Sequence, residues 1–96
     1  MVRATALHYW ENQPMKNAEI LMFSGPGCHA CTAMKPIMEG IPHSRVVDVT
    51  EEHELAARYG IRGGLPVFIK ILDGAYADRV SGAMPKNKFI DWCRKQ

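Results

Sequence analysis

Cysteine is scarce in this chain, since three of its 96 residues are cysteines, an odd number. Small secreted domains that are held together by disulfides use more cysteines and pair them. The low, odd count argues against a scaffold of that kind. We therefore expect an intracellular, cytoplasmic protein, because a disulfide there is transient.

Long apolar runs, a leader peptide and a strong net charge are lacking as well. The longest uninterrupted apolar run, 20–23, has four residues, whereas a membrane helix needs about 20. Residues 1–8 show no sustained apolar stretch followed by a cleavage site, so we expect no secretory signal and no membrane association. The net charge of +2 and the lack of a basic run with interleaved aromatic residues argue against a nucleic-acid partner.

What remains is the composition of an ordinary globular protein. Hydrophobic residues make up 47% of the chain and charged residues 23%, which is enough for one modest core. The sequence contains no internal repeat, linker or low-complexity segment. We expect residues 1–96 to form a single domain and to be monomeric.

The most informative stretch is a pair of cysteines, Cys28 and Cys31, which follows an apolar run and a Gly/Pro turn and precedes a helical pattern. Cys28 is therefore expected at the start of a helix. The helix dipole and the unpaired N–H groups at that position favour an anion, and hence the reactive thiolate of Cys28. Helical residues three apart have Cβ atoms about 5 to 6 Å apart, close to disulfide geometry. The spacing indicates a dithiol that opens and closes reversibly.

Two other interpretations of the cysteine pair stay open, namely half of a zinc site and inert packing against a core. A structural zinc site needs two further ligands. The remaining candidates, Cys93, His8, His43 and His53, are not spaced as a second ligand pair. A redox motif is expected after a strand and before a helix, as here. We therefore favour redox chemistry, with no metal and no cofactor other than the disulfide itself.

Apolar periodicity outlines the first strand and helix. Residues 18–23 are almost continuously apolar, as in a central strand that is covered on both faces. Pro36 lies inside the helix that follows, so a kink is expected there, and Gly40 and Pro42 close the helix. The helical stripe that we expect to be buried consists of Ala30, Ala33, Met34, Ile37, Met38 and Ile41.

The second half of the chain shows alternating strand and helix patterns. Strands are expected at 45–49, 67–72 and 75–80. Asp73 and Gly74 separate the last two strands, as in a two-residue hairpin. Thr50 is expected to cap a helix that ends at Gly60. A final helix is expected to bury Phe89, Ile90 and Cys93.

These elements predict the α/β class, as a small three-layer sandwich in which helices flank a mixed central sheet. The sheet has four strands, or five if residues 2–10 add a strand at one edge.

The order of the motifs closely resembles the thioredoxin family. The matching features are C-x-x-C at the head of a helix, Pro36, Tyr59-Gly60-Ile61-Arg62-Gly63, Pro66 at the start of a strand and Val80-Ser81-Gly82-Ala83. The resemblance covers roughly residues 18–95, and the surroundings of Cys28 and Pro66 also look like glutaredoxin. It implies a thioredoxin-like fold and a thiol-disulfide oxidoreductase that takes part in electron transport and cell redox homeostasis.

The resemblance also implies roles for single residues. Cys28 matches the exposed nucleophile and Cys31 matches the resolving thiol. Pro66 matches a cis-proline, and the backbone of Leu65 before it is expected to pair with an extended substrate segment. The positions expected to bind substrate are Gly27, Leu65, Pro66 and Gly82. The implied substrates are disulfide-containing proteins, and the implied electron donor is a flavin-dependent thioredoxin reductase or glutathione.

The chain departs from the family pattern close to the cysteines. Gly27 stands where thioredoxin has tryptophan, and His29-Ala30 replaces Gly-Pro between the cysteines. Met22 and Val46 occupy the positions of the buried aspartate and its lysine partner. The usual proton acceptor for Cys31 is therefore missing.

His29 is the one candidate for tuning the site. A protonated imidazole near Cys28 would stabilise the thiolate and make the disulfide more oxidising; the alternative is a merely exposed side chain. Two other functions are kept beside the protein reductase. One is a glutaredoxin-like, glutathione-coupled reductase, although no lysine before Cys28 matches the one that helps to hold glutathione. The other is a non-catalytic docking module.

Overall fold

The computed structural model describes residues 18–95. In chain order, the elements are β1 (Ala18–Ser24), α1 (His29–Glu39), β2 (Ser44–Asp48), α2 (His53–Arg58), β3 (Val67–Leu72), β4 (Ala75–Ser81) and α3 (Lys86–Arg94). No helix in this part of the chain is long and apolar enough to cross a membrane. The edge strand expected within residues 2–10 lies outside the described residues.

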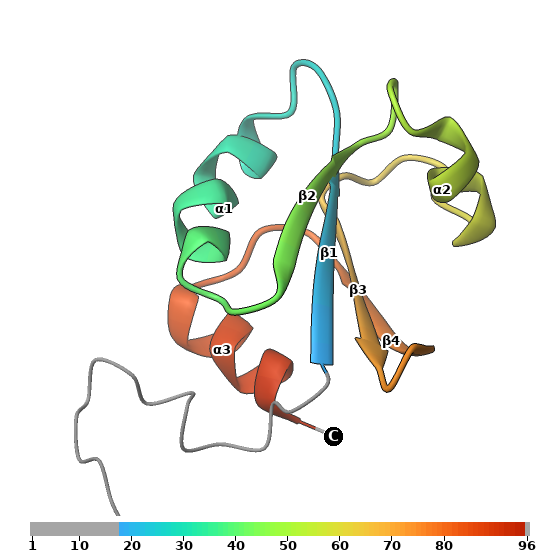
Figure 1. Ribbon diagram of the computed structural model, residues 1–96. Coiled ribbons are helices and arrows are strands. Elements are labelled where there is room, and N and C mark those ends of the chain that lie inside the picture. Colours follow the sequence, from blue (N-terminus) through green and yellow to red (C-terminus); the bar gives the residue numbers. More distant parts are fainter. Residues whose placement is uncertain (1–17, 96) are drawn as a thin grey trace, which may run out of the picture.

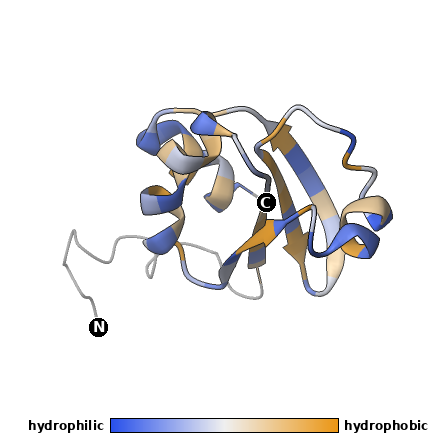
Figure 2. Cartoon of the chain, turned by 90° about the horizontal axis from the view of Figure 1, so that it is seen from above, coloured by the Kyte–Doolittle hydropathy of each residue, from blue (hydrophilic) through white to orange (hydrophobic). Residues whose placement is uncertain are grey.

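The strands form one mixed sheet in the order β2-β1-β3-β4. β1 runs parallel to β2 and antiparallel to β3, and β4 is antiparallel to β3. α1 and α3 cover one face of the sheet, whereas α2 lies on the other face (Figure 1). Figure 2 shows the hydrophobic strands between helices whose surfaces mix hydrophilic and hydrophobic residues. The predicted three-layer α/β sandwich is confirmed.

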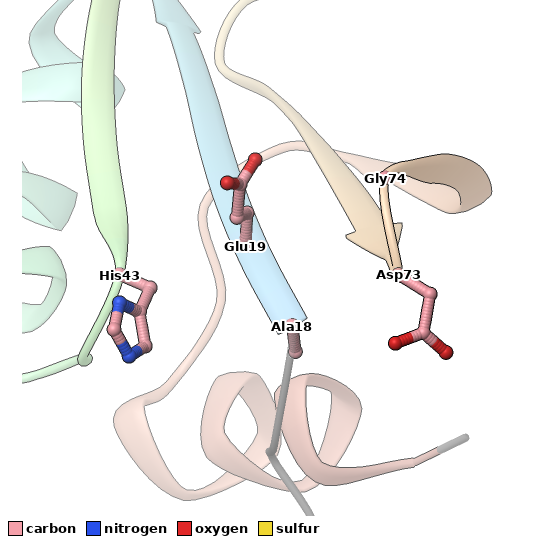
Figure 3. Close-up of a pocket in the computed structure, with 5 residues that line it drawn as sticks. All are labelled: Ala18, Glu19, His43, Asp73 and Gly74. Carbon is pink, nitrogen blue, oxygen red and sulfur yellow. The ribbon is translucent and has the colours of Figure 1, made fainter.

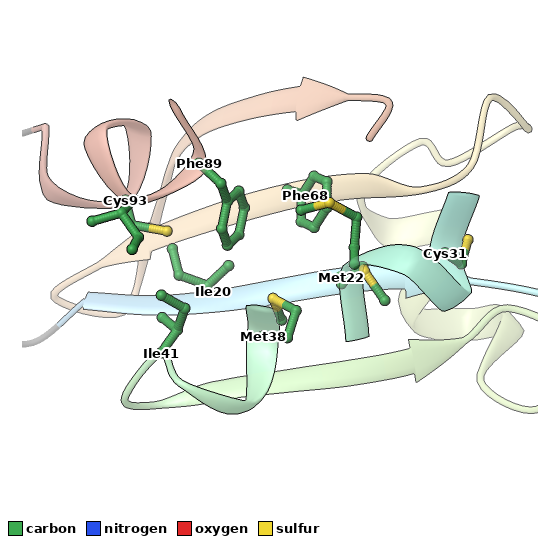
Figure 4. Packing of buried hydrophobic residues seen from close by; sticks show 10 residues of the cluster. Ile20, Met22, Cys31, Met38, Ile41, Phe68, Phe89 and Cys93 are labelled. Carbon is green, nitrogen blue, oxygen red and sulfur yellow. The ribbon is translucent and has the colours of Figure 1, made fainter. Parts of the chain in front are cut away.

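β1 is the central strand and is buried on both faces. Ile20 and Met22 point to the side of α1 and α3, where they join the larger apolar cluster (Figure 4). Leu21 and Phe23 point to the opposite side and join the cluster beneath α2. Alternate residues of a strand face opposite sides, so a nearly continuous apolar sequence supplies both cores. Burial of each such side chain stabilises the fold by about 1.5–3 kcal/mol.

α1 lies on the sheet with a narrower buried stripe than the sequence suggests. Cys31, Met34 and Met38 are buried, and so is Ile41 just after the helix. Ala33 is exposed, so its predicted burial is wrong. The reason is that Cys31 itself belongs to the stripe, and each helical residue is rotated by about 100° from the next, which turns Ala33 away from Met34.

The segment between β2 and α2 also corrects a prediction. α2 begins at His53 with Glu52 as its N-cap, so Thr50 is not the cap. Instead, the amide and the hydroxyl of Thr50 both donate hydrogen bonds to Oδ1 of Asp48, at 2.8 and 2.6 Å. An aspartate at the end of a strand readily binds the backbone two residues on. The resulting turn delays the helix.

The β3–β4 hairpin forms as predicted. Asp73 and Gly74 have φ values of 52° and 82°, the positive values that a tight two-residue hairpin requires. An irregularity between Lys70 and Ile71 shifts the register of the two strands. Lys70 lies two residues after Phe68 and so points to the same face of the sheet, toward α3, where it is 2% exposed.

Lys70 closes the C-terminal end of α3. Its Nζ donates hydrogen bonds to the carbonyl of Trp92 and, at 2.5 Å, to the carbonyl of Lys95. The ammonium also lies 4.7 Å from the centre of the Trp92 ring, whose Nε1 donates to Asp78. Burial lowers the pKa of Lys70. The lysine thus donates to carbonyls at the C-terminal end of α3, where the carbonyl of Trp92 also accepts a hydrogen bond from the N–H of Lys95 at 3.3 Å.

Cys93, on the buried face of α3, is a packing residue as its sequence position suggests. It is 2% exposed, and burial raises the pKa of its thiol from 9.0 to about 12. A thiol that binds its proton more tightly in the folded chain stabilises that chain below pH 9. This contribution is lost as the pH rises from 9 toward 12.

This loss predicts a pH-dependent difference between the native chain and Cys93→Ala, with Cys28 and Cys31 replaced by alanine in both proteins to prevent disulfide exchange. Between pH 8 and pH 10, the free energy of unfolding should fall by about 1.4 kcal/mol more in the protein that keeps Cys93. Urea denaturation at each pH measures the free energy of unfolding. Parallel pH profiles would show that the thiol does not resist ionisation.

Candidate functional site

Cys28 occupies the N-cap of α1, as predicted. Its backbone is extended, with φ −90° and ψ 98°, and the helix follows at His29. The N–H of Cys31 donates a hydrogen bond to Sγ of Cys28 at 3.1 Å. The first turn of α1 holds no acidic residue. The sulfur therefore lies where a helix terminus favours a negative charge and nothing in that turn opposes it.

Cys28 and Cys31 are joined by a disulfide, with their Cα atoms 5.2 Å apart. Their environments differ. Cys28 is half-buried, whereas Cys31 is 1% exposed and packs in the cluster that contains Met22 and Met34. An incoming thiol or disulfide can therefore reach Cys28, while Cys31 is confined behind it.

The loop before β3 lies beside the disulfide. The bond from Leu65 to Pro66 is cis, as the resemblance implied. Pro66 is fully buried, and its carbonyl accepts a hydrogen bond from the N–H of Gly82 at 2.8 Å. A Cβ added at Gly25 would lie 3.1 Å from Cδ1 of Leu65, so the loop preceding Cys28 approaches this loop closely.

The structure thus brings together the loops that carry the predicted site residues. Leu65 and Cys28 pack against the same apolar cluster. Gly82 is held at the site by the hydrogen bond from its N–H to the carbonyl of Pro66. Gly27 and Gly82 have φ values of 75° and 94°, in the region that favours glycine. Both glycines therefore shape backbone next to the disulfide without adding side chains.

His29 is the first residue of α1, and its side chain is exposed. It borders a hollow that also includes Cys28. Met22, in the position of the family's aspartate, is fully buried in the apolar cluster with Cys31 (Figure 4). The buried end of the site is therefore apolar, and the polar groups lie at its mouth.

Sequence reasoning missed two charged residues at this mouth, Lys35 and Asp48, which line the same hollow. Lys35 lies on α1 seven residues after Cys28, a spacing of two helical turns that was a usable signal. Asp48 comes from β2, and only the parallel pairing of β2 with β1 places it here.

A second hollow, of about 490 Å³, lies at the opposite end of the sheet and is lined by Ala18, Glu19, His43, Asp73 and Gly74. Its imidazole and carboxylates do not gather around one point (Figure 3). Within residues 18–95, no group of three or more histidine, cysteine, aspartate or glutamate side chains is arranged to hold a metal ion. The redox-capable cysteines are at the other end.

A mixed sheet between helices, with a C-x-x-C disulfide at the head of α1 and a cis-proline loop beside it, defines a thioredoxin-fold domain with a dithiol site. The Thioredoxin family model matches residues 4–95. The chain belongs to the thioredoxin family.

Known proteins of similar sequence and structure agree with this assignment. Protein disulfide isomerase-like 1-3 of Arabidopsis thaliana is 31% identical over 81 residues, which is 77% of this chain and 14% of that protein. The thioredoxin of Fasciola hepatica is 29% identical, with a TM-score of 0.70 and 82% of each chain covered. A thioredoxin mutant of Halobacterium salinarum, at 24% identity, shares the fold with a TM-score of 0.74 over 80% of this chain and 72% of its own.

The two positions of the cysteines predict different reactivities. Two variants, each also carrying Cys93→Ala, have one thiol apiece. Cys31→Ser keeps Cys28 as its single thiol, and Cys28→Ser keeps Cys31. At pH 7, iodoacetamide should alkylate Cys28 at least about threefold faster than a peptide cysteine, because a thiolate of lower pKa is more populated but somewhat less nucleophilic. Cys31 should react more slowly than the peptide. Mass spectrometry of timed samples gives both rates, and equal rates for the two variants would contradict the site.

Proposed function

We propose that the protein is a thiol-disulfide oxidoreductase that reduces disulfides in partner proteins. The observation that carries this proposal is the arrangement of two joined sulfurs. The sulfur of Cys28 is accessible at a helix N-terminus, and the sulfur of Cys31 is buried behind it. The Cα atoms of the two cysteines are 5.2 Å apart. Membership of the thioredoxin family supports the same chemistry.

The reaction begins with the reduced pair. The Cys28 thiolate attacks one sulfur of the substrate disulfide, so that a mixed disulfide forms and the other substrate sulfur leaves as a thiolate. Cys31 then attacks Sγ of Cys28, which releases the second substrate thiol and closes the Cys28–Cys31 bond. Two electrons pass to the substrate. Met22 is apolar, so the proton of Cys31 goes to water, to His29 or to the departing substrate thiolate.

The loops around Cys28 provide the site for an extended substrate segment. The backbone of Leu65 pairs with that segment, as in other cases of strand addition. Gly27, Pro66 and Gly82 form the remaining contact surface, where the lack of side chains at the glycines allows a partner backbone to come close. The disulfide of the substrate then lies over Cys28.

The setting of the reaction is part of the proposal. The donor that restores the dithiol is a flavin-dependent thioredoxin reductase or glutathione. The three cysteines of the chain favour a reducing compartment such as the cytoplasm, where a monomer of this kind contributes to electron transport and redox homeostasis. No metal or cofactor takes part besides the disulfide itself.

Reduction of insulin driven by dithiothreitol tests the activity. Cys28→Ser should abolish turnover, because the attacking sulfur is gone. Pre-reduced Cys31→Ser, mixed with insulin after dithiothreitol has been removed, should accumulate a mixed disulfide between Cys28 and the substrate, which mass spectrometry detects and added dithiothreitol releases. Cys93→Ala is the matched control and should keep the native rate.

The same variants separate catalysis from simple docking. A docking module would retain partner binding in Cys28→Ser and would show no insulin reduction in the native protein. Equal turnover by native protein and Cys28→Ser would refute the proposed enzyme. A mixed disulfide on Cys31 in place of Cys28 would reverse the assigned roles.

His29 is proposed to tune the pair. If its imidazolium stabilises the Cys28 thiolate, His29→Ala should shift the equilibrium with a defined glutathione buffer toward the disulfide form by about three- to tenfold. The absence of a shift in the same buffer would show that His29 is only exposed.

A further inference from the structure

Gly25, in the turn that leads from β1 to Cys28, is the point where the cysteine loop contacts the loop that carries Leu65. A Cβ added at Gly25 would lie 3.1 Å from Cδ1 of Leu65 and 3.5 Å from Cγ2 of Val49. The second distance is an ordinary van der Waals contact, whereas at the first distance the two atoms must separate by a few tenths of an ångström. A methyl group on residue 25 would therefore press on Leu65.

Backbone conformation does not require glycine at position 25. Within residues 18–95, six other glycines have positive φ values, and Gly25 is not one of them. Positive φ is the condition that disfavours a side chain. Alanine is therefore compatible with the backbone at this position, and the contact with Leu65 is what an added methyl group would change.

The side chain of Leu65 has little room to move away from such a methyl group. It packs against both apolar clusters, the larger one on the side of α1 and α3 and the one beneath α2. Closely packed side chains transmit strain to their surroundings because few voids are available to absorb it. The pressure on Leu65 is therefore passed to its backbone.

The backbone around Leu65 is anchored on one side only. On the C-terminal side, Pro66 is fully buried, and its carbonyl accepts the hydrogen bond from the N–H of Gly82 at 2.8 Å. On the N-terminal side, a Cβ added at Gly63 or Gly64 would have no atom within 4 Å. The glycine side therefore yields, and the backbone of Leu65 shifts relative to the cysteine loop.

We propose that Gly25 is a positioning residue, which sets the separation between Cys28 and the backbone of Leu65 and thereby favours protein disulfides over small ones. A protein substrate has to meet both groups at once, whereas a small disulfide needs only the sulfur of Cys28. The inference rests on the proposed function, in which Leu65 pairs with the substrate. A misplacement of about 1 Å can cost about 100-fold in rate, so a few tenths of an ångström should cost about two- to fivefold.

The test compares insulin with 2-hydroxyethyl disulfide as oxidants of the reduced, full-length protein after dithiothreitol has been removed. The measured quantity is the ratio of the second-order rate constant for insulin to that for 2-hydroxyethyl disulfide. Gly25→Ala should lower this ratio about two- to fivefold, because only insulin has to meet Leu65. Gly40→Ala is the matched control and should leave the ratio unchanged, since Gly40 is exposed at the end of α1 with a φ of −91°.

A change in Leu65 tests whether Gly25 acts through this contact. Leu65→Val lacks Cδ1, so Gly25→Ala should no longer lower the ratio when it is added to Leu65→Val. The inference would be overturned by equal ratios in Gly25→Ala and Gly40→Ala, or by a fall that persists when Leu65→Val is present. Both results would leave the oxidoreductase function intact. A native protein that neither disulfide oxidises would instead refute the function itself.

Discussion

The hydrogen bond from the Cys31 N–H to Sγ of Cys28 is the interaction on which this molecule's chemistry depends. It exists because a sulfur takes the place of an N-cap oxygen, so that a free N–H at the start of α1 points at the group that must carry negative charge. Because Cys28 and Cys31 are three residues apart on one helix face, their Cα atoms are only 5.2 Å apart. A single geometry therefore places the proposed nucleophile, favours its ionised form and supplies the second thiol.

That geometry is held by the two-sided burial of β1. Apolar side chains lock the strand from both faces, so the turn that leaves it begins at a defined point, and α1 is anchored by Met34 and Met38 against the same sheet. Cys31 belongs to this packing, whereas Cys28 stands at its edge. The difference in accessibility between the two sulfurs thus follows from the core itself.

Outside the site, some features of the fold follow from the local sequence and others depend on tertiary contacts. The hairpin at Asp73 and Gly74 was predictable, because two residues with positive φ are enough to reverse a strand. The start of α2 was not predictable, because the N–H and the hydroxyl of Thr50 donate hydrogen bonds to Asp48, and Thr50 therefore does not cap the helix. The sequence presents Lys70 as the polar residue of a strand, yet Lys70 is buried under α3, where carbonyls 22 and 25 residues later in the chain accept hydrogen bonds from its ammonium.

The amino-acid sequence by itself determined the α/β class, the order of the elements and the position of both cysteines at the head of a helix. These features depend on hydrophobic periodicity and on turn residues, which act over a few positions. Tertiary structure alone decided which sulfur is accessible, that the Gly82 N–H meets the Pro66 carbonyl, and that Asp48 stands near Lys35 beside Cys28. Those relations join segments far apart in the chain, and they exist only after the strands have paired and the helices have packed on them.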